Sequence, residues 1–204
     1  DLSQAMDQRK VDEKSMLMRY FYALIGEDLN VYGSNEFNQP QDDSLLFFNT
    51  IGKNYQLAPG DTIQITITGL SPSNENYQVM NDGTITLENV YPLNVNNLNL
   101  NQVSKLILDK ISLDDASAEV FVRLNNARLV TVQISGNVKS PRTIAVPAYT
   151  PLSRVIAFSG GISDSGSLRN ISLSQIGETT QAVDFYNFLQ NASPKLDPLI
   201  KNGA

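Results

Sequence analysis

The sequence contains no cysteine, no histidine and no tryptophan in its 204 residues. Without cysteine, the chain can form neither a disulfide nor a thiolate nucleophile or metal ligand. Without histidine, it lacks the side chain that most often serves as a general base or a metal ligand near neutral pH. These absences exclude disulfide-stabilised domains, zinc sites that use Cys or His, and the common Ser-His and Cys-His catalytic pairs.

Long apolar runs and clustered basic charge are also missing. No stretch approaches the roughly 18 apolar residues that a membrane-spanning helix requires. Residues 1–50 hold nine acidic and four basic residues, so most of the formal net charge of −6 lies there. Phosphate neutralisation needs concentrated Lys and Arg, and we therefore expect no nucleic-acid partner.

The beginning of the sequence does not look like a targeting segment. Its first residue is Asp1 rather than methionine, and charged residues are mixed with apolar ones over the first twenty positions. A secretory signal has an uninterrupted apolar segment instead. We expect the sequence to be a piece of a longer polypeptide.

The chain divides into three segments, of which the first is residues 1–50. Apolar residues recur near helical spacing over residues 1–28, which predicts a helix there. Gly33, Pro40 and several Asn and Asp residues then interrupt any period, which predicts an irregular arm. We expect the helix to dock on another part of the protein or to pair with another copy.

The second segment, residues 51–126, is predicted to be a β-rich domain with one helix. The helix is expected over residues 100–111, because Asn99 and Gln102 have the spacing of a capping box. Pro59-Gly60 predicts a tight turn before the first strand, and Asp82-Gly83 predicts a type I′ hairpin turn. Alternation of apolar and polar residues predicts strands at 62–68, 77–80, 84–87 and 118–124.

The third segment, residues 127–204, has the element order of a β-grasp unit. Thr150 is predicted to cap a helix with Pro151 at its first position, and Gly160-Gly161 is predicted to end that helix. The whole chain is therefore expected to be α+β. Strands are predicted around 129–136, 142–146, 169–174 and 180–184, and a small helix around 184–190.

Two motifs in the second segment are informative together. They are Tyr55-x-Leu57-x-Pro59-Gly60-Asp61 and Asp82-Gly83-Thr84-Ile85. Together they resemble the polysaccharide export domain of outer-membrane exporters of the Wza type. The resemblance assigns a structural role to Tyr55, Leu57, Pro59, Gly60, Asp61, Asp82 and Gly83.

The third segment carries its own motif set. It reads Val132-x-Ile134-x-Gly136-x-Val138, Ser140-Pro141-x-x-Ile144-x-Val146, Thr150-Pro151-Leu152 and Ala157-x-Ser159-Gly160-Gly161. This set is similar to the SLBB (soluble ligand-binding β-grasp) family, in which Gly136, Pro141, Gly160 and Gly161 are structural. Arg142 stands where the family usually has glycine. Upstream, Val31-Tyr32-Gly33-x-x-x-Phe37 resembles the arm of longer members with several SLBB domains.

An export domain followed by an SLBB domain is the usual order in this family, and it implies a function. The chain would be the periplasmic part of an outer-membrane channel that exports capsule polysaccharide or exopolysaccharide. It would form a homo-oligomeric ring, contact the polysaccharide and meet an inner-membrane polysaccharide co-polymerase. The resemblance implies no cofactor, no metal and no catalytic residue.

Two other functions remain open from the residues. A soluble ligand-binding or glycan-binding β-grasp module without a transport role is the main alternative. An enzyme would need paired carboxylates, for which the candidates are Asp42/Asp43, Asp114/Asp115 and Asp61 with Asp82. We interpret these acids as turn residues. Five tyrosines could stack on sugar rings: Tyr55, Tyr77, Tyr91, Tyr149 and Tyr186.

Overall fold

The computed structural model describes two compact units, each with its own core. Unit 2 contains the described residues from Tyr55 to Val130 together with residues 145–149. Unit 1 contains the described residues up to Phe37, residues 131–144 and the described residues from Thr150 onward. The described residues are 16–27, 32–33, 37, 55–88, 91–113, 115–163, 165–191 and 193–204.

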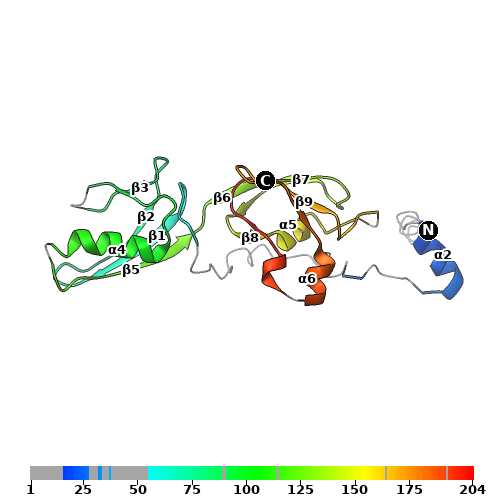
Figure 1. Ribbon diagram of the computed structural model, residues 1–204, viewed down its shortest axis with the longest axis horizontal. Helices are drawn as coiled ribbons and strands as arrows, with labels where there is room; N and C mark the ends of the chain where they lie inside the picture. Colours follow the sequence, from blue (N-terminus) through cyan, green and yellow to red (C-terminus); the bar gives the residue numbers. More distant parts are fainter. Residues whose placement is uncertain are drawn as a thin grey trace, which may run out of the picture. The chain divides into compact units, whose positions relative to one another are not determined.

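Unit 2 is built on an antiparallel three-stranded sheet with the order β2-β1-β5. The sheet comprises β1 (Thr62–Thr68), β2 (Ser73–Gln78) and β5 (Glu119–Asn126). Ile63 and Ile65 of β1 are buried, and the helix α4 (Leu100–Ile111) covers the sheet with its buried Val103 and Ile107 (Figure 1). The alternation of apolar residues in β1 thus produces one buried face, as predicted.

The local signals at both ends of this region are confirmed. Asn99 accepts a hydrogen bond from the backbone N–H of Gln102, and the Gln102 side chain accepts one from the backbone N–H of Asn99. Pro59-Gly60 forms a type II turn, because Gly60 has a φ of 95° and the Asp61 N–H donates to the carbonyl of Ala58.

Two strand predictions in unit 2 require correction. β2 begins at Ser73 rather than near 77, since Ser73 and Asn74 pair with Ile67 and Thr66 of β1. β3 (Thr84–Ile85) pairs with β4 (Leu93–Asn94) instead of returning along β2.

The type I′ turn predicted at Asp82-Gly83 is also wrong. Gly83 has a φ of 80°, but Asp82 is not among the described residues with positive φ. The Asp82 side chain instead accepts hydrogen bonds from the backbone N–H and the hydroxyl of Thr84, at 3.0 and 2.7 Å. The turn runs from Met80 to Gly83, because the N–H of Gly83 donates to the carbonyl of Met80 at 2.9 Å.

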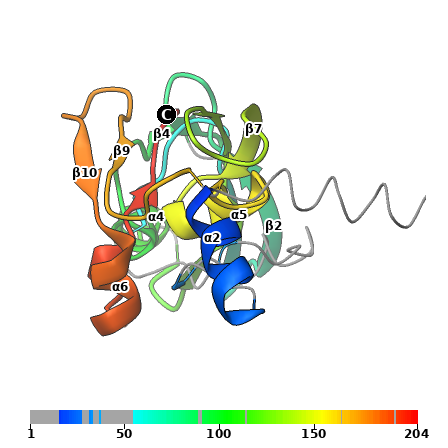
Figure 2. The same ribbon diagram turned by 90° about the vertical axis from the view of Figure 1, so that its right-hand side faces the viewer.

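Unit 1 surrounds a short helix, α5 (Leu152–Phe158), with pairs of strands (Figure 2). β6 (Leu129–Ile134) pairs with β7 (Arg142–Pro147), and the chain passes between the units inside these two strands. The other pairs are β9 (Ile171–Leu173) with β10 (Gln181–Val183), and β8 (Thr150–Pro151) with β11 (Leu199–Ile200). The helices α6 (Phe185–Asn191) and η2 (Pro194–Leu196) lie between β10 and β11 in the sequence.

The beginning of α5 differs from the prediction. Thr150 is fully buried in β8 and does not cap the helix, which begins at Leu152 after Pro151. The acceptor comes from Asp197, whose carboxylate binds the backbone N–H of Ser153 at 3.0 Å and its hydroxyl at 2.5 Å. Gly160 and Gly161 both have positive φ and follow the last turn, as expected.

The described part of the first segment belongs to unit 1. The helix predicted over 1–28 is confirmed for α2 (Met16–Ile25), and residues 1–15 and 28 lie outside the described residues. Phe37 is 3% exposed and packs on Phe185, with 5.2 Å between ring centroids. The ring of Tyr32 stacks on Tyr186 at 6.2 Å. With helices and antiparallel strands in both units, the α+β fold class is confirmed.

Candidate functional site

The most conspicuous polar site in unit 2 centres on Asp61, whose side chain is completely buried. One carboxylate oxygen accepts from the Tyr55 hydroxyl at 2.6 Å and from the backbone N–H of Arg128 at 2.7 Å. The other accepts from the backbone N–H of Ala58 at 2.8 Å and from the Arg128 guanidinium at 3.2 Å. Four donors therefore satisfy this carboxylate.

The hydrogen bonds of Asp61 indicate a structural role for this residue. Burial raises the pKa of Tyr55 far above its ordinary value, and the hydrogen bond to Asp61 raises it further, so the phenol remains a neutral donor. A carboxylate held by four donors and closed off from solvent offers no free oxygen to a substrate. The network fixes the turn before β1 to the segment that follows β5.

The family-motif residues of unit 1 meet in space around the end of α5. The backbone N–H of Lys139 donates to the carbonyl of Gly161, and that of Ser140, next to Pro141, donates to the carbonyl of Ser159. Arg142, the departure from the family pattern, donates from its guanidinium to the carbonyl of Phe158. A cation at the C-terminal end of a helix is favourable, so this substitution has a local role.

Gly136 lies in the turn after β6 and differs from the two glycines at the end of α5. It has a φ of 88°, and a Cβ placed on it would meet nothing within 4 Å. Glycine is therefore required there for backbone conformation alone.

The acidic residues do not form a catalytic pair among the described residues. Asp61 is buried in its network, whereas Asp82 is an exposed turn residue whose pKa is lowered by the hydrogen bonds from Thr84. Asp115 binds Ser117 and the backbone N–H of Leu70, which lower its pKa. Asp42, Asp43 and Asp114 lie outside the described residues. Within the part that the structure describes, no group of three His, Cys, Asp or Glu residues could hold a metal ion.

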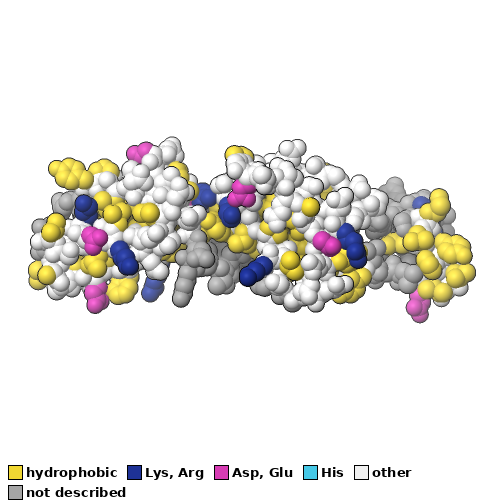
Figure 3. Space-filling view, viewed as in Figure 1, with side chains coloured by type: hydrophobic (Ala, Val, Ile, Leu, Met, Phe, Trp, Pro, Cys, Tyr) yellow, Lys and Arg dark blue, Asp and Glu magenta, His cyan; other side chains and the backbone are white. Residues whose placement is uncertain are grey.

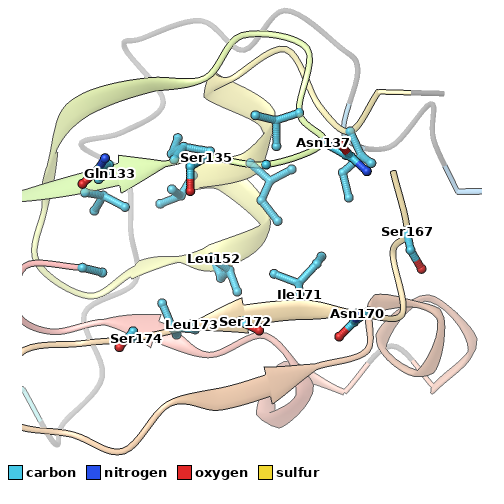
Figure 4. Close-up of a pocket in the computed structure, with 18 of the residues that line it drawn as sticks. Gln133, Ser135, Asn137, Leu152, Ser167, Asn170, Ile171, Ser172, Leu173 and Ser174 are labelled. Carbon is cyan, nitrogen blue, oxygen red and sulfur yellow. The ribbon is translucent and has the colours of Figure 1, made fainter. Parts of the chain in front are cut away.

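Unit 1 contains a hollow of about 540 Å³ between β6 and β9. Its floor is apolar, since Leu152, Val155 and Ile156 of α5 lie beneath it. In Figure 4, Gln133 and Ser135 follow one long side of the hollow. Its rim consists of uncharged polar side chains, namely Gln133, Ser135, Asn137, Ser165, Ser167, Asn170, Ser172 and Ser174.

A second hollow, of about 590 Å³, lies on unit 2 beside the end of α4. Tyr77 and the 91% exposed Tyr91 line it together with Glu75, Glu88 and Lys110. Burial raises the pKa of Tyr77 to about 12, and its hydrogen bond to Glu75 contributes. An aromatic ring beside carboxylates and an ammonium group can receive either a sugar or a protein side chain.

The five tyrosines that could contact sugar differ in burial and in their neighbours. Tyr55 is 1% exposed and packs against Tyr149 at 4.6 Å between ring centroids, so it cannot stack on a glycan. Tyr186 stacks on Tyr32 and lies 5.0 Å from the Arg169 guanidinium. Tyr77 and Tyr91 are the two that lie together at a hollow.

The helix α2 presents an unusual surface. None of its ten residues is buried, although most of them are apolar. Figure 3 shows apolar side chains gathered on this helix, at the right-hand end of the view. Leu17, Tyr20 and Leu24, which are 67%, 61% and 64% exposed, have the spacing of one helical face. Exposed apolar patches of this kind mark contact surfaces.

Two family models match consecutive parts of the chain. Residues 49–125 match the model of the polysaccharide biosynthesis/export protein family, and residues 131–184 match the SLBB domain. These two consecutive matches confirm the recognition of a polysaccharide export domain followed by an SLBB domain. The boundary between the two matches falls where β5 ends and β6 begins.

Two curated relatives are similar over most of the chain. Both are polysialic acid transport proteins KpsD of Escherichia coli, each 28% identical over 165 residues. The match covers 79% of this chain but 29% of each relative. Among the described residues, no helix has the length and apolar character needed to cross a membrane.

Proposed function

We propose that this chain is the periplasmic part of an outer-membrane polysaccharide export channel and acts as a non-catalytic, ring-forming subunit. The observation that carries the proposal is the pair of consecutive domain matches, export domain then SLBB domain. The relatives are named as transport proteins for polysialic acid, and we extend polysaccharide transport to this chain. Its polymer would be a capsule polysaccharide or an exopolysaccharide.

The proposed mechanism is passive conduction through a ring. A closed ring requires two different surfaces on each subunit, because each copy contacts its neighbours head to tail. We assign one of these surfaces to α2, whose face of Leu17, Tyr20 and Leu24 is exposed. The hollow on unit 2 with Tyr77 and Tyr91 is our candidate for the contact with polysaccharide or with an inner-membrane co-polymerase.

The family-motif residues would act by holding the scaffold in shape. Asp61 fixes the turn of Pro59 and Gly60 to Arg128, and Tyr55 closes the same network. The carbonyls of Ser159 and Gly161 hold the end of α5 against the turn at Pro141. None of these groups would touch the moving polymer.

Assembly can be tested on the protein as it stands. We expect its mass, measured by light scattering over a concentration series, to rise with concentration. Leu17→Lys combined with Leu24→Lys should reduce this rise, because two charges would enter the apolar face of α2. Leu113→Lys is the control, since Leu113 is an exposed leucine as well, at 85%, and lies in unit 2. A strict monomer at every concentration would count against the ring subunit.

One observation favours the alternative, a soluble binding module. The hollow in unit 1 has an apolar floor and a rim of uncharged polar groups, which suits a neutral ligand. A monomer that binds a neutral oligosaccharide stoichiometrically in calorimetry would support this alternative over export.

A further inference from the structure

The sheet of unit 2 has two faces of opposite character. Ile63 and Ile65 of β1 are buried on the face that α4 covers (Figure 1). Successive residues of a strand point to opposite faces, and residues directly opposite each other on paired strands share a face. The other face, here called the open face, therefore consists of Thr62, Gln64, Thr66 and Thr68 of β1, Asn74, Asn76 and Gln78 of β2, and Glu119, Phe121 and Arg123 of β5. All of these residues are exposed or half-buried.

The open face is rich in amides and nearly free of charge. On β1 and β2 it consists of Thr, Asn and Gln alone, and on β5 the charges of Glu119 and Arg123 have opposite signs. Asparagine is depleted in strands, yet β2 carries Asn74 and Asn76 on this one face. A strand that contains residues of poor strand propensity without a gain in packing indicates a role beyond its own stability.

The polar groups of the open face have hydrogen-bonding capacity to spare. The Thr66 hydroxyl donates to the Asn74 amide oxygen at 3.0 Å, which leaves the NH2 group of Asn74 available. Among the described residues, the open-face side chains that make no hydrogen bond or ion pair include Gln64, Asn76, Gln78 and Arg123. An amide both donates and accepts, and so does a hydroxyl group. A row of free amides therefore matches a molecule that presents many hydroxyl groups.

One aromatic ring lies among these amides. Phe121 is opposite Thr66 in the register, and it is 50% exposed. Covering an exposed phenyl ring with another apolar surface is favourable. A sugar ring has hydroxyl groups at its edge and C–H groups on its faces, so the open face offers partners to both.

We propose that the open face is a polysaccharide-binding surface, on which the hydroxyl groups of an extended glycan bond to the amides and a sugar ring packs on Phe121. The choice of a polysaccharide rests on the proposed export function. Along β2 the amides recur at every second residue, roughly 7 Å apart. Such a surface recognises hydroxyl groups in series rather than one particular sugar, and its individual contacts are weak enough to release a moving polymer.

The opposite side of unit 2 has a different chemistry. Tyr77 is paired with Ile63 and shares its face, so the hollow that Tyr77 lines lies on the side of α4. That hollow carries Glu75 and Glu88 beside apolar side chains. Apolar area with carboxylates suits a protein partner that has basic groups, whereas uncharged amides suit hydroxyl groups. We therefore assign the polysaccharide to the open face.

The test is an NMR titration of the isotope-labelled protein with two hexasaccharides. One is neutral, maltohexaose, and the other is acidic, a hexamer of sialic acid. We expect both to shift the side-chain NH2 signals of the open-face amides, because the proposed contacts are made to hydroxyl groups. The Kd should be on the order of 1–10 mM, since the site consists of exposed hydrogen bonds and one ring.

Two variants locate the binding, and a third is their control. Asn76→Ala should raise the Kd of both hexasaccharides about three- to tenfold, because one amide is lost. Phe121→Leu keeps an apolar side chain but removes the ring, and it should also raise the Kd. Asn101→Ala is the matched control for Asn76→Ala, since Asn101 is an exposed asparagine on α4, and it should leave the Kd unchanged.

The proposal is overturned if neither hexasaccharide shifts the open-face amides, or if Asn76→Ala and Asn101→Ala have equal effects. Shifts confined to the hollow of Tyr77 and Tyr91 would place the glycan there instead. Shifts of the open-face amides that grow with protein concentration, without sugar, would assign this face to a second copy. Ring assembly is measured separately by light scattering. A strict monomer that binds both hexasaccharides on the open face would contradict the ring subunit and leave the glycan site in place.

Discussion

Unit 2 has a continuous sheet of three strands with one helix packed on it, whereas unit 1 distributes its strands over separate pairs. Unit 2 also fixes its ends by a buried carboxylate with four donors, and unit 1 has an unfilled hollow beside its helix. Two neighbouring domains of similar size can therefore depend on different forces. A buried polar network joins the ends of unit 2, whereas the strand pairs of unit 1 pack around the buried side chains of α5.

The largest effect should come from removing the polar centre of unit 2. Asp61→Ala removes the carboxylate that accepts from the Arg128 guanidinium, the Tyr55 hydroxyl and two backbone N–H groups. Breaking a buried ion pair on one side costs about 3–5 kcal/mol. We expect unit 2 to lose this amount in urea unfolding followed by amide exchange, while unit 1 keeps its stability.

The exposed Asp82→Ala is the matched control for Asp61→Ala. It removes an acid from the other half of the same family motif, but its carboxylate binds Thr84 in solvent. We expect a change much smaller than that of Asp61→Ala. Comparable losses in the two variants would mean that burial of the Asp61 network does not dominate the stability of unit 2.

The next effect concerns the packing of the arm on unit 1. Phe37→Ala removes a ring that is 3% exposed and lies against Phe185, which should cost about 3 kcal/mol of unit 1 stability. Tyr32→Ala is the control, because Tyr32 is 64% exposed although it stacks on Tyr186. Thermal unfolding of both variants should show a clearly lower Tm for the first alone.

The stability of unit 1 should depend on pH through Asp197. Burial raises the pKa of Asp197, and its hydrogen bonds to Ser153 oppose that rise in part. The folded state therefore binds more protons than the unfolded state between the ordinary Asp pKa, about 3.9, and the raised value. In this window we expect the free energy of unfolding to fall as pH rises, and to level off above it.

Asp197→Asn tests that expectation, because it cannot titrate but keeps one acceptor for Ser153. The free energy of unfolding of the wild-type protein and of the variant is measured by urea unfolding from pH 3 to 8. The difference between the two should vary with pH only through the titration of Asp197. Parallel profiles would contradict the raised pKa.

The smallest effect should come from the helix cap of unit 2. Asn99→Ala removes the acceptor for the N–H of Gln102 and should cost roughly 1 kcal/mol. Gln102→Ala removes the reciprocal bond to the N–H of Asn99 and should cost less. If Asn99→Ala proved as costly as Asp61→Ala, the contrast between buried and exposed polar groups would not hold.

The sequence predicted those features whose physical cause is local. The capping box of α4 and the turn at Pro59-Gly60 depend on residues within four positions of one another, and both are confirmed. The alternation in β1 likewise identifies its buried face. The SLBB-like motif includes Ser159 and Gly161, whose carbonyls accept from the N–H groups of Ser140 and Lys139.

The turn at Asp82-Gly83 was predicted wrongly although its contacts are local, whereas two other features depend on partners that are distant in the sequence. Thr150 looked like a helix cap, but Asp197 supplies the acceptor to Ser153 from 44 positions away. Asp61 looked like a local turn residue, and its ion pair with Arg128 spans 67 positions. Only tertiary packing brings such groups together, so no local pattern could reveal them.

The Asp61–Arg128 contact also has a meaning for how this protein could be engineered. It joins the turn before β1 to the segment after β5, which are one hydrogen bond apart at 2.7 Å, although residues 145–149 return to unit 2 later in the chain. A stretch with neighbouring ends can be exchanged with little change to the flanking backbone, but an exchange of unit 2 would also have to supply residues 145–149. Unit 1 likewise holds several separate stretches of the chain, so neither unit is a simple insertion into the other.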